Sequence, residues 1–318
     1  MAAKMTFALS LVFTVTASVA FHLRNAREIR APESQGNDIL IFGGSESAST
    51  ILKFDTSAGV VRQIGKMPAR SAHIAGQYGK KILLAGAVQI YDTPLLYDEK
   101  GELSEASHPA EVVTRLSASS GWKAGATVGD RFYACGGAYP STKDCFYYSF
   151  TDEKWSHGAS MPSRRDAAAA VGVGDRYLFV LGGNDGAGVT QATLRLDTQT
   201  GVWSKMTDMP EPRQAHAAAL VRVGRRDTIL VCGGSEGAAF SADCFLYDVL
   251  SDAWSKAAPL QEPRAHFRLS TCGGSIHAIG GYTPEGNLSS IERLEKISWQ
   301  LLDATLPEAN NDFALACV

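Results

Sequence analysis

The chain has 318 residues, of which 45% are hydrophobic, and a formal net charge of −3. That is enough apolar material for a sizeable core. Lys and Arg are scattered along the chain, which argues against nucleic acid or an anionic membrane as a partner, because both favour clustered positive charge. Thirty-one glycines against twelve prolines indicate many short strands joined by tight turns.

The N-terminal stretch resembles a secretory signal peptide. Lys4 supplies a positive charge, Met5 to Val19 is mostly apolar, and Ser18-Val19-Ala20 resembles a cleavage site of small residues. The stretch is short and rich in Thr and Ser for a membrane span, so an uncleaved anchor is the less favoured alternative. We therefore expect residues 1–20 to be a signal peptide and 21–36 a linker. The protein is expected to be secreted, with no membrane insertion after cleavage.

From residue 37 onward, one pattern recurs six times. A short apolar run ends in a double glycine at five places, and a degenerate copy stands at Ala85-Gly86. Successive copies lie 42 to 51 residues apart, a period typical of propeller blades. The five intact copies are Gly43-Gly44, Gly136-Gly137, Gly182-Gly183, Gly233-Gly234 and Gly280-Gly281.

Each repeat predicts four strands in a fixed order. A turn with an Arg leads into a strand of small residues, which suits the innermost strand, where blades converge. A polar turn follows, and then comes the apolar strand that ends in the double glycine. A third strand carries Tyr148, Leu196 or Tyr247, and a fourth carries Trp155, Trp203 or Trp254. Large rings suit the wider outer part of a blade. A single blade would expose both of its apolar faces to solvent, so the units must stack around an axis.

These residues resemble the Kelch repeat, and the resemblance covers residues 37–318. Six motifs imply an all-β, six-bladed Kelch β-propeller with four-stranded blades. The first repeat begins at its second strand, Asp38 to Phe42, while Phe313 to Val318 looks like an inner strand with nothing after it. We expect this C-terminal strand to complete blade one and close the ring, which removes unpaired edges.

Six cysteines provide a second set of expectations. Cys135 and Cys145, like Cys232 and Cys244, flank the loop between the second and third strands of one blade. Opposite positions on paired strands lie close to disulfide distance, and a secreted chain favours oxidation. We therefore expect two disulfides within blades, against the alternative of free buried thiols. Cys272 and Cys317 fall on neighbouring inner strands, and a third disulfide and two buried thiols are equally compatible with the sequence.

Catalytic and metal-binding signatures are absent from the sequence. It has no G-x-S-x-G, H-E-x-x-H or C-x-x-C motif, and its seven histidines show no strong metal-ligand spacing. We expect no cofactor and no metal, and the sequence favours a binding protein over an enzyme. The enzymatic alternative is a carbohydrate isomerase, because sialic-acid mutarotase is a secreted six-bladed Kelch propeller, and ring opening at an anomeric centre needs only a positioned acid and base.

The candidate ligand-binding residues stand where successive inner strands begin. In Kelch propellers these turns meet the loops between the second and third strands on one face, around the channel. Cations from several blades would converge there and clamp carboxylates; the alternative is that each Arg ties its own turn to backbone carbonyls. The residues are Arg70, His73, Arg165, Asp166, Arg213, His216, Arg264 and His266.

The resemblance implies a secreted interaction module. We expect it to bind a protein segment or a glycan at that one face, with removal of Arg213 and Arg264 weakening binding while changing stability little. Asn287-Leu288-Ser289 is an N-glycosylation sequon in one of the loops of the same face.

Overall fold

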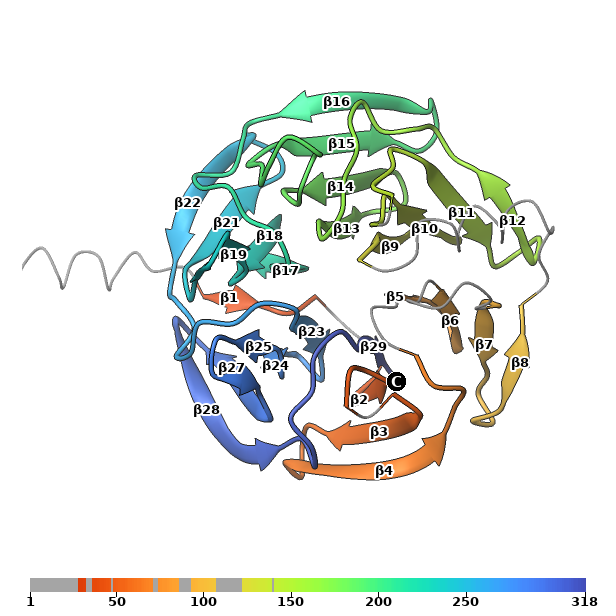
Figure 1. Ribbon diagram of the computed structural model, residues 1–318, viewed down its shortest axis with the longest axis vertical. Coiled ribbons are helices and arrows are strands. Elements are labelled where there is room, and N and C mark those ends of the chain that lie inside the picture. Colours follow the sequence, from red (N-terminus) through yellow and green to blue (C-terminus); the bar gives the residue numbers. More distant parts are fainter. Residues whose placement is uncertain are drawn as a thin grey trace, which may run out of the picture.

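The computed structural model describes residues 28–32, 36–46, 48–70, 74–85, 93–106, 122–138 and 140–318. These residues form six four-stranded antiparallel sheets arranged around a central axis (Figure 1). The expected all-β propeller with six four-stranded blades is confirmed. The expected signal peptide lies outside the described residues, and no helix within them is both long and apolar enough to cross a membrane.

Each blade is named here in chain order, and its strands run from the axis outward. Blade one contains β29 (Ala314–Cys317), β2 (Asp38–Phe42), β3 (Thr50–Asp55) and β4 (Val60–Lys66). Blade two contains β5 (Ile74–Tyr78), β6 (Lys81–Ala85), β7 (Leu95–Tyr97) and β8 (Leu103–Glu105). Blade three contains β9 (Ala124–Val128), β10 (Arg131–Cys135), β11 (Cys145–Ser149) and β12 (Lys154–His157).

The other three blades follow the same plan. Blade four contains β13 (Ala169–Val173), β14 (Tyr177–Leu181), β15 (Thr193–Asp197) and β16 (Val202–Met206). Blade five contains β17 (Ala217–Val223), β18 (Arg226–Cys232), β21 (Cys244–Asp248) and β22 (Ala253–Ala257). Blade six contains β23 (Arg268–Cys272), β24 (Ser275–Ile279), β27 (Ser290–Glu295) and β28 (Ser298–Thr305).

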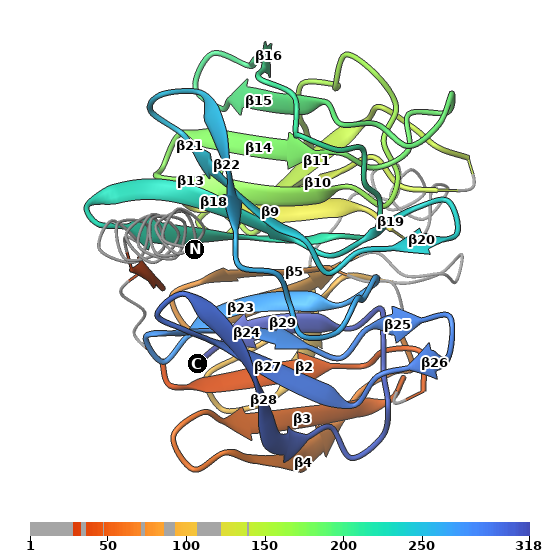
Figure 2. The same cartoon turned by 90° about the vertical axis from the view of Figure 1, so that its left-hand side faces the viewer.

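Two small hairpins stand on one face, formed by the loops between the second and third strands of blades five and six. They are β19 (Ser235–Glu236) with β20 (Ala239–Phe240), and β25 (Tyr282–Thr283) with β26 (Gly286–Asn287). Figure 2 shows both projecting on the side away from the C-terminus. We call this side the mouth face, because the inner strands begin there.

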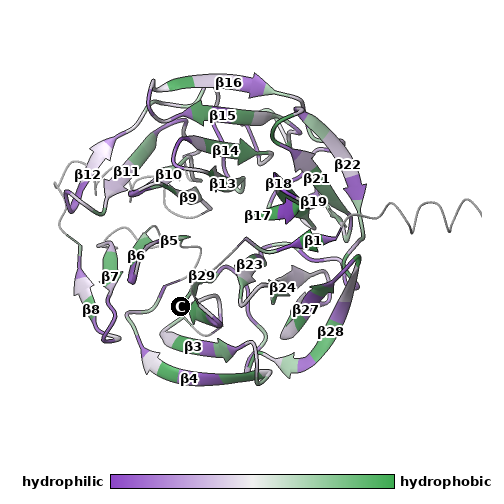
Figure 3. Ribbon diagram, turned by 180° about the vertical axis from the view of Figure 1, so that it is seen from behind, coloured by the Kyte–Doolittle hydropathy of each residue, from purple (hydrophilic) through white to green (hydrophobic). Residues whose placement is uncertain are grey.

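The core consists of six apolar clusters, one between each pair of neighbouring blades. The second strands are buried on both sides, which explains their continuous apolar runs, and the outermost strands mix polar and apolar residues (Figure 3). Tyr148 pairs directly with Trp155, and Tyr247 with Trp254, on the third and fourth strands as expected.

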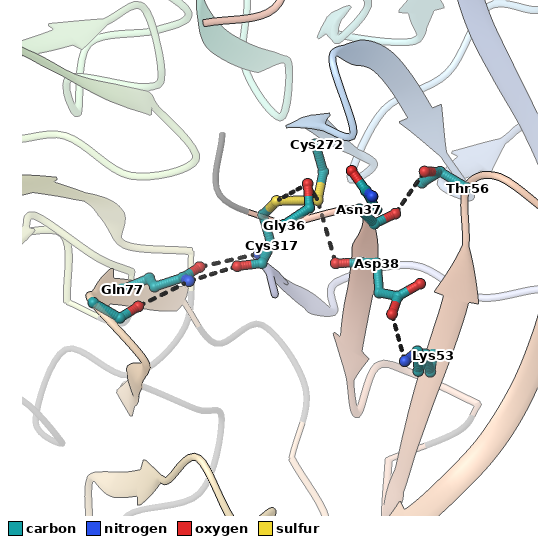
Figure 4. The surroundings of a disulfide bond; sticks show 9 residues. Gly36, Asn37, Asp38, Lys53, Thr56, Gln77, Cys272 and Cys317 are labelled. Carbon is teal, nitrogen blue, oxygen red and sulfur yellow. Dashed lines mark hydrogen bonds and ion pairs between the residues drawn. A yellow bond between two sulfur atoms is a disulfide. The ribbon is translucent and has the colours of Figure 1, made fainter. Parts of the chain in front are cut away.

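Ring closure occurs in blade one, where the C-terminal strand β29 pairs antiparallel with β2. Cys317 at its end forms a disulfide with Cys272 of blade six, with their Cα atoms 5.5 Å apart. On the other side, the Gln77 side chain of blade two accepts a hydrogen bond from the Cys317 backbone N–H, at 3.0 Å, and donates one to its carbonyl oxygen (Figure 4). The last strand is therefore joined to both neighbouring blades.

The remaining cysteines pair inside blades. Cys135 lies opposite Cys145 and Cys232 opposite Cys244 in the ladders, and both pairs form disulfides with Cα atoms 4.1 Å apart. All six cysteines are thus oxidised.

Part of the expected linker is ordered against the propeller. β1 (Ile29–Arg30) pairs antiparallel with Val223 and Arg222 at the far end of β17, and adds a fifth strand to the sheet of blade five. Ile29 and Ala31 pack on the apolar cluster between blades five and six. The N-terminal segment therefore covers part of the face opposite the mouth.

The double glycine allows the backbones of neighbouring blades to approach each other closely. Gly182 has φ +57°, and a Cβ there would lie 2.5 Å from the carbonyl oxygen of Arg213 in the next blade. The amide of Gly183 donates to that same carbonyl at 2.8 Å. Only glycine allows both the left-handed backbone and this close approach.

Replacing Gly182 with Ala should therefore destabilise the protein by at least about 2 kcal/mol, from backbone strain plus the clash with Arg213. Gly174 is the matched control, because it has the same φ of +57° and nothing within 4 Å of the position that a Cβ would take. Urea unfolding of both variants measures the difference. Equal losses from the two substitutions would contradict the close packing of backbones between blades.

Candidate functional site

The mouth face carries a ring of residues with left-handed backbone, one where each of five described inner strands begins. Each described member after the first donates its backbone N–H to the carbonyl oxygen of the preceding member, at 2.8–3.1 Å, and φ lies between 49° and 54° throughout. The blade-two position, residue 72, falls outside the described residues. The five described members are Trp122, Ala167, Ala215, His266 and Asp312.

Three of these side chains meet across the ring. Nδ1 of His266 lies 2.9 Å from Oδ1 of Asp312, and Nε1 of Trp122 donates to Oδ2 of Asp312 at 3.4 Å. The rings of Trp122 and His266 are 5.6 Å apart. We call these three residues the mouth cluster.

The charge of Asp312 is stabilised in this cluster. Burial alone would raise the pKa of Asp312, but the hydrogen bond and charge of His266, the charge of Arg268 and the Trp122 indole N–H outweigh burial and lower it. Asp312 therefore stays ionised, and both of its oxygens are engaged.

The four repeat arginines are buried, whereas the sequence analysis expects cations that converge at the mouth and bind a ligand there. Arg213 is 2% exposed, and its Nη1 donates to the carbonyl oxygens of Gly233 and Asp243 in its own blade, at 2.8 Å each. Arg264 is 0% exposed and donates in the same way to Gly280 and Ser290. Arg70 and Arg165 are also buried, and each donates to a backbone carbonyl, of Thr93 and Arg164. Charged hydrogen bonds therefore tie these side chains to the backbone of turns inside the blades.

Two acidic partners that the sequence reasoning missed accompany these arginines. Glu211 pairs with Arg213 at 2.7 Å, and Glu262 with Arg264 at 2.9 Å. The signal was present as a repeated Glu-Pro-Arg triplet. Arg264 also bonds to Glu292 at 2.7 Å, and this carboxylate is fully buried.

The other predicted residues divide into buried and accessible ones. Burial and the charge of Arg213 lower the pKa of His216 to about 3, so its imidazole is neutral at physiological pH. Asp166 is half-buried, and burial raises its pKa more than the nearby Ser141 hydroxyl lowers it. His266 belongs to the mouth cluster, and His73 lies outside the described residues. Asn287 is accessible in part and donates to Glu46 at 3.0 Å.

The rim beside the mouth cluster carries an aromatic pair. Phe240 and Tyr282, one from each small hairpin, have ring centroids 5.8 Å apart, and Tyr282 is 38% exposed. Tyr282 exchanges backbone hydrogen bonds with Ala265, the residue directly before His266. The rim pair and the mouth cluster are therefore adjacent.

Comparison with known proteins agrees with the propeller architecture. Residues 121–300 match the KLHDC2/KLHL20/DRC7 Kelch-repeats domain. The chain belongs to the Kelch-repeat family. An F-box/kelch-repeat protein of Arabidopsis thaliana is 30% identical over 117 residues, which are 36% of this chain and 29% of that protein.

Two further relatives are also matched over part of their length. Alpha-scruin of Limulus polyphemus is 30% identical over 167 residues, 48% of this chain and 18% of that protein. Kelch-like protein 36 of Bos taurus is 24% identical over 160 residues, 50% of this chain and 24% of that protein. The chain thus matches less than a third of each relative.

The solved structure of YjhT superimposes with a TM-score of 0.68 at 15% identity, covering 87% of this Kelch chain and 97% of that one, which shows a shared fold.

Substituting Arg264 with Ala should destabilise this Kelch propeller by about 3–5 kcal/mol, because the buried Glu292 carboxylate loses its ionic partner. Arg213→Ala should cost only about 1–3 kcal/mol, since two buried carbonyls lose a donor while Glu211, 52% exposed, remains hydrated. Chemical denaturation of both variants gives the comparison. An Arg264→Ala protein as stable as the parent would show that this arginine has no structural role.

Proposed function

We propose that this Kelch propeller is a secreted interaction module that binds a protein segment or a glycan at its mouth face. The observation that carries the proposal is the exposed Tyr282, packed on Phe240 beside the mouth cluster. Aromatic rings with a polar edge dominate binding energy at many interfaces, and they stack equally well on apolar side chains and on sugar rings. Asp166 and His266 supply further polar groups on the same face.

Secretion is part of the proposal. It is supported by the signal-like residues 1–20 and by the oxidation of all six cysteines, because structural disulfides persist in oxidising compartments. Export would also give the Asn287 sequon access to glycosylation.

The ligand can be found by presenting the purified protein to a glycan array and to a displayed peptide library. With the ligand identified, Tyr282→Ala should weaken binding at least fivefold, roughly 1 kcal/mol or more, while the melting temperature changes little. Calorimetric titration measures the affinity.

Tyr78 is the matched control for this test. It is 47% exposed and its ring packs on Phe150 at 5.7 Å, but it lies at the end of β5 on the opposite face. Tyr78→Ala should bind like the parent protein. Equal affinities for parent and Tyr282→Ala, or a loss confined to Tyr78→Ala, would overturn the assignment to the mouth face.

A carbohydrate isomerase resembling sialic-acid mutarotase is the second candidate. The hydrogen-bonded His266–Asp312 pair favours it, because ring opening needs a positioned acid and base. Two features weaken it: a lowered pKa makes Asp312 a poor base, and both of its oxygens are already engaged. Faster anomer exchange of a reducing sugar, followed by NMR and abolished in His266→Ala, would favour the isomerase over the binding module.

A further inference from the structure

One inner-strand position breaks the repeat. In five blades the first residue of the inner strand pairs with the residue just before the double glycine, and in blade two Ile74 pairs with Ala85 at the degenerate copy. Five blades place a small or aliphatic residue there, and blade six places Arg268, opposite Ile279. The five counterparts are Ala314, Ile74, Ala124, Ala169 and Ala217.

Arg268 lines a cavity of about 180 Å3 at the centre of the propeller. The walls come from the starts of the inner strands of all six blades, and half of the lining residues are alanine. Lys123 and His216 line the cavity together with Arg268. The mouth cluster stands in the ring of residues that begins these strands, so the cavity lies directly behind the candidate binding face.

Arg268 is partly buried, and its guanidinium has few hydrogen-bond partners. Among the described residues it makes one hydrogen bond, from Nη1 to the carbonyl oxygen of Phe267, at 3.2 Å. The nearest opposing charge is Asp312, but both oxygens of that carboxylate bond to His266 and Trp122. Burial lowers the pKa of Arg268 and the charge of Asp312 raises it, yet an arginine remains a cation in proteins.

Such an arrangement costs stability unless something else pairs with the charge. A cation that is partly removed from water and has one protein hydrogen bond loses part of its hydration without full compensation, and five blades avoid that cost with an apolar residue. The arginine is also the side chain whose planar fork matches a carboxylate with two parallel hydrogen bonds. Alanine methyl groups around it suit the small apolar end of such an anion.

We propose that the central cavity is a binding site for a small free carboxylate of about the size of acetate, held by Arg268. The site is separate from the aromatic rim, and it does not depend on the protein or glycan ligand proposed above. Its occupant neutralises the charge of blade six and links the inner strands across the channel.

The probe for this site is sodium acetate, added to the purified protein at constant ionic strength maintained with sodium chloride. The melting temperature should rise with acetate concentration and saturate, because a ligand bound to the folded state alone stabilises it by mass action. Arg268→Ala should weaken the apparent affinity about 10- to 100-fold, the equivalent of one or two charged hydrogen bonds. The exposed Arg222→Ala is the control and should respond like the parent.

The Arg268→Ala variant should fold, because four other blades have Ala at this position. Without acetate, Arg268→Ala should melt at or above the parent temperature, because a partly buried cation with few hydrogen bonds has been removed. Arg268→Lys should retain weak acetate binding, through charge without the planar fork. A parent protein indifferent to acetate, or an Arg268→Ala variant that responds as the parent does, would overturn the proposal.

Discussion

The backbone hydrogen bond between neighbouring blades is the interaction on which the rest of this propeller depends. In each described case the second glycine of one blade donates to a carbonyl where the next blade begins: Gly44 to Arg70, Gly137 to Arg165, Gly183 to Arg213, Gly234 to Arg264 and Gly281 to Asn310. The contact brings two backbones so close that a Cβ on the preceding glycine would clash. Because it fixes where each inner strand begins, it also fixes the ring of left-handed residues two positions later. The mouth cluster is therefore a consequence of blade stacking.

Closure couples these contacts into one ring. The strand β29 follows the other propeller strands in the chain and completes the first blade, so blade one has its inner ladder only when the two ends of the propeller meet. The Cys272–Cys317 disulfide and the Gln77 side chain then join that strand to blades six and two. A ring built this way has no unpaired terminal blade, which removes the exposed edge of an open array.

Much of this architecture is predictable from the sequence, because glycine pairs, small inner strands and outer tryptophans each meet a local constraint that recurs in most of the six blades. The site was less predictable for two physical reasons. The Arg of each repeat is visible in the sequence. The direction of its side chain, however, depends on carbonyl oxygens that only the fold brings near, such as those of Gly233 and Asp243, which bind Arg213. Trp122, His266 and Asp312 lie in separate repeats and meet only across the closed ring. Departures from the repeat were the missed signal: Arg268 stands where other blades have Ala or Ile.

Truncation at residue 311 tests the closure of the ring most directly. We expect a chain lacking residues 312–318 to lose cooperative thermal unfolding, because β2 loses its inner partner and blades six, one and two are no longer joined. The test compares calorimetric melting of the truncated chain with that of the full chain at equal concentration. A truncated protein with the same single transition at the same temperature would contradict the dependence of the fold on ring closure.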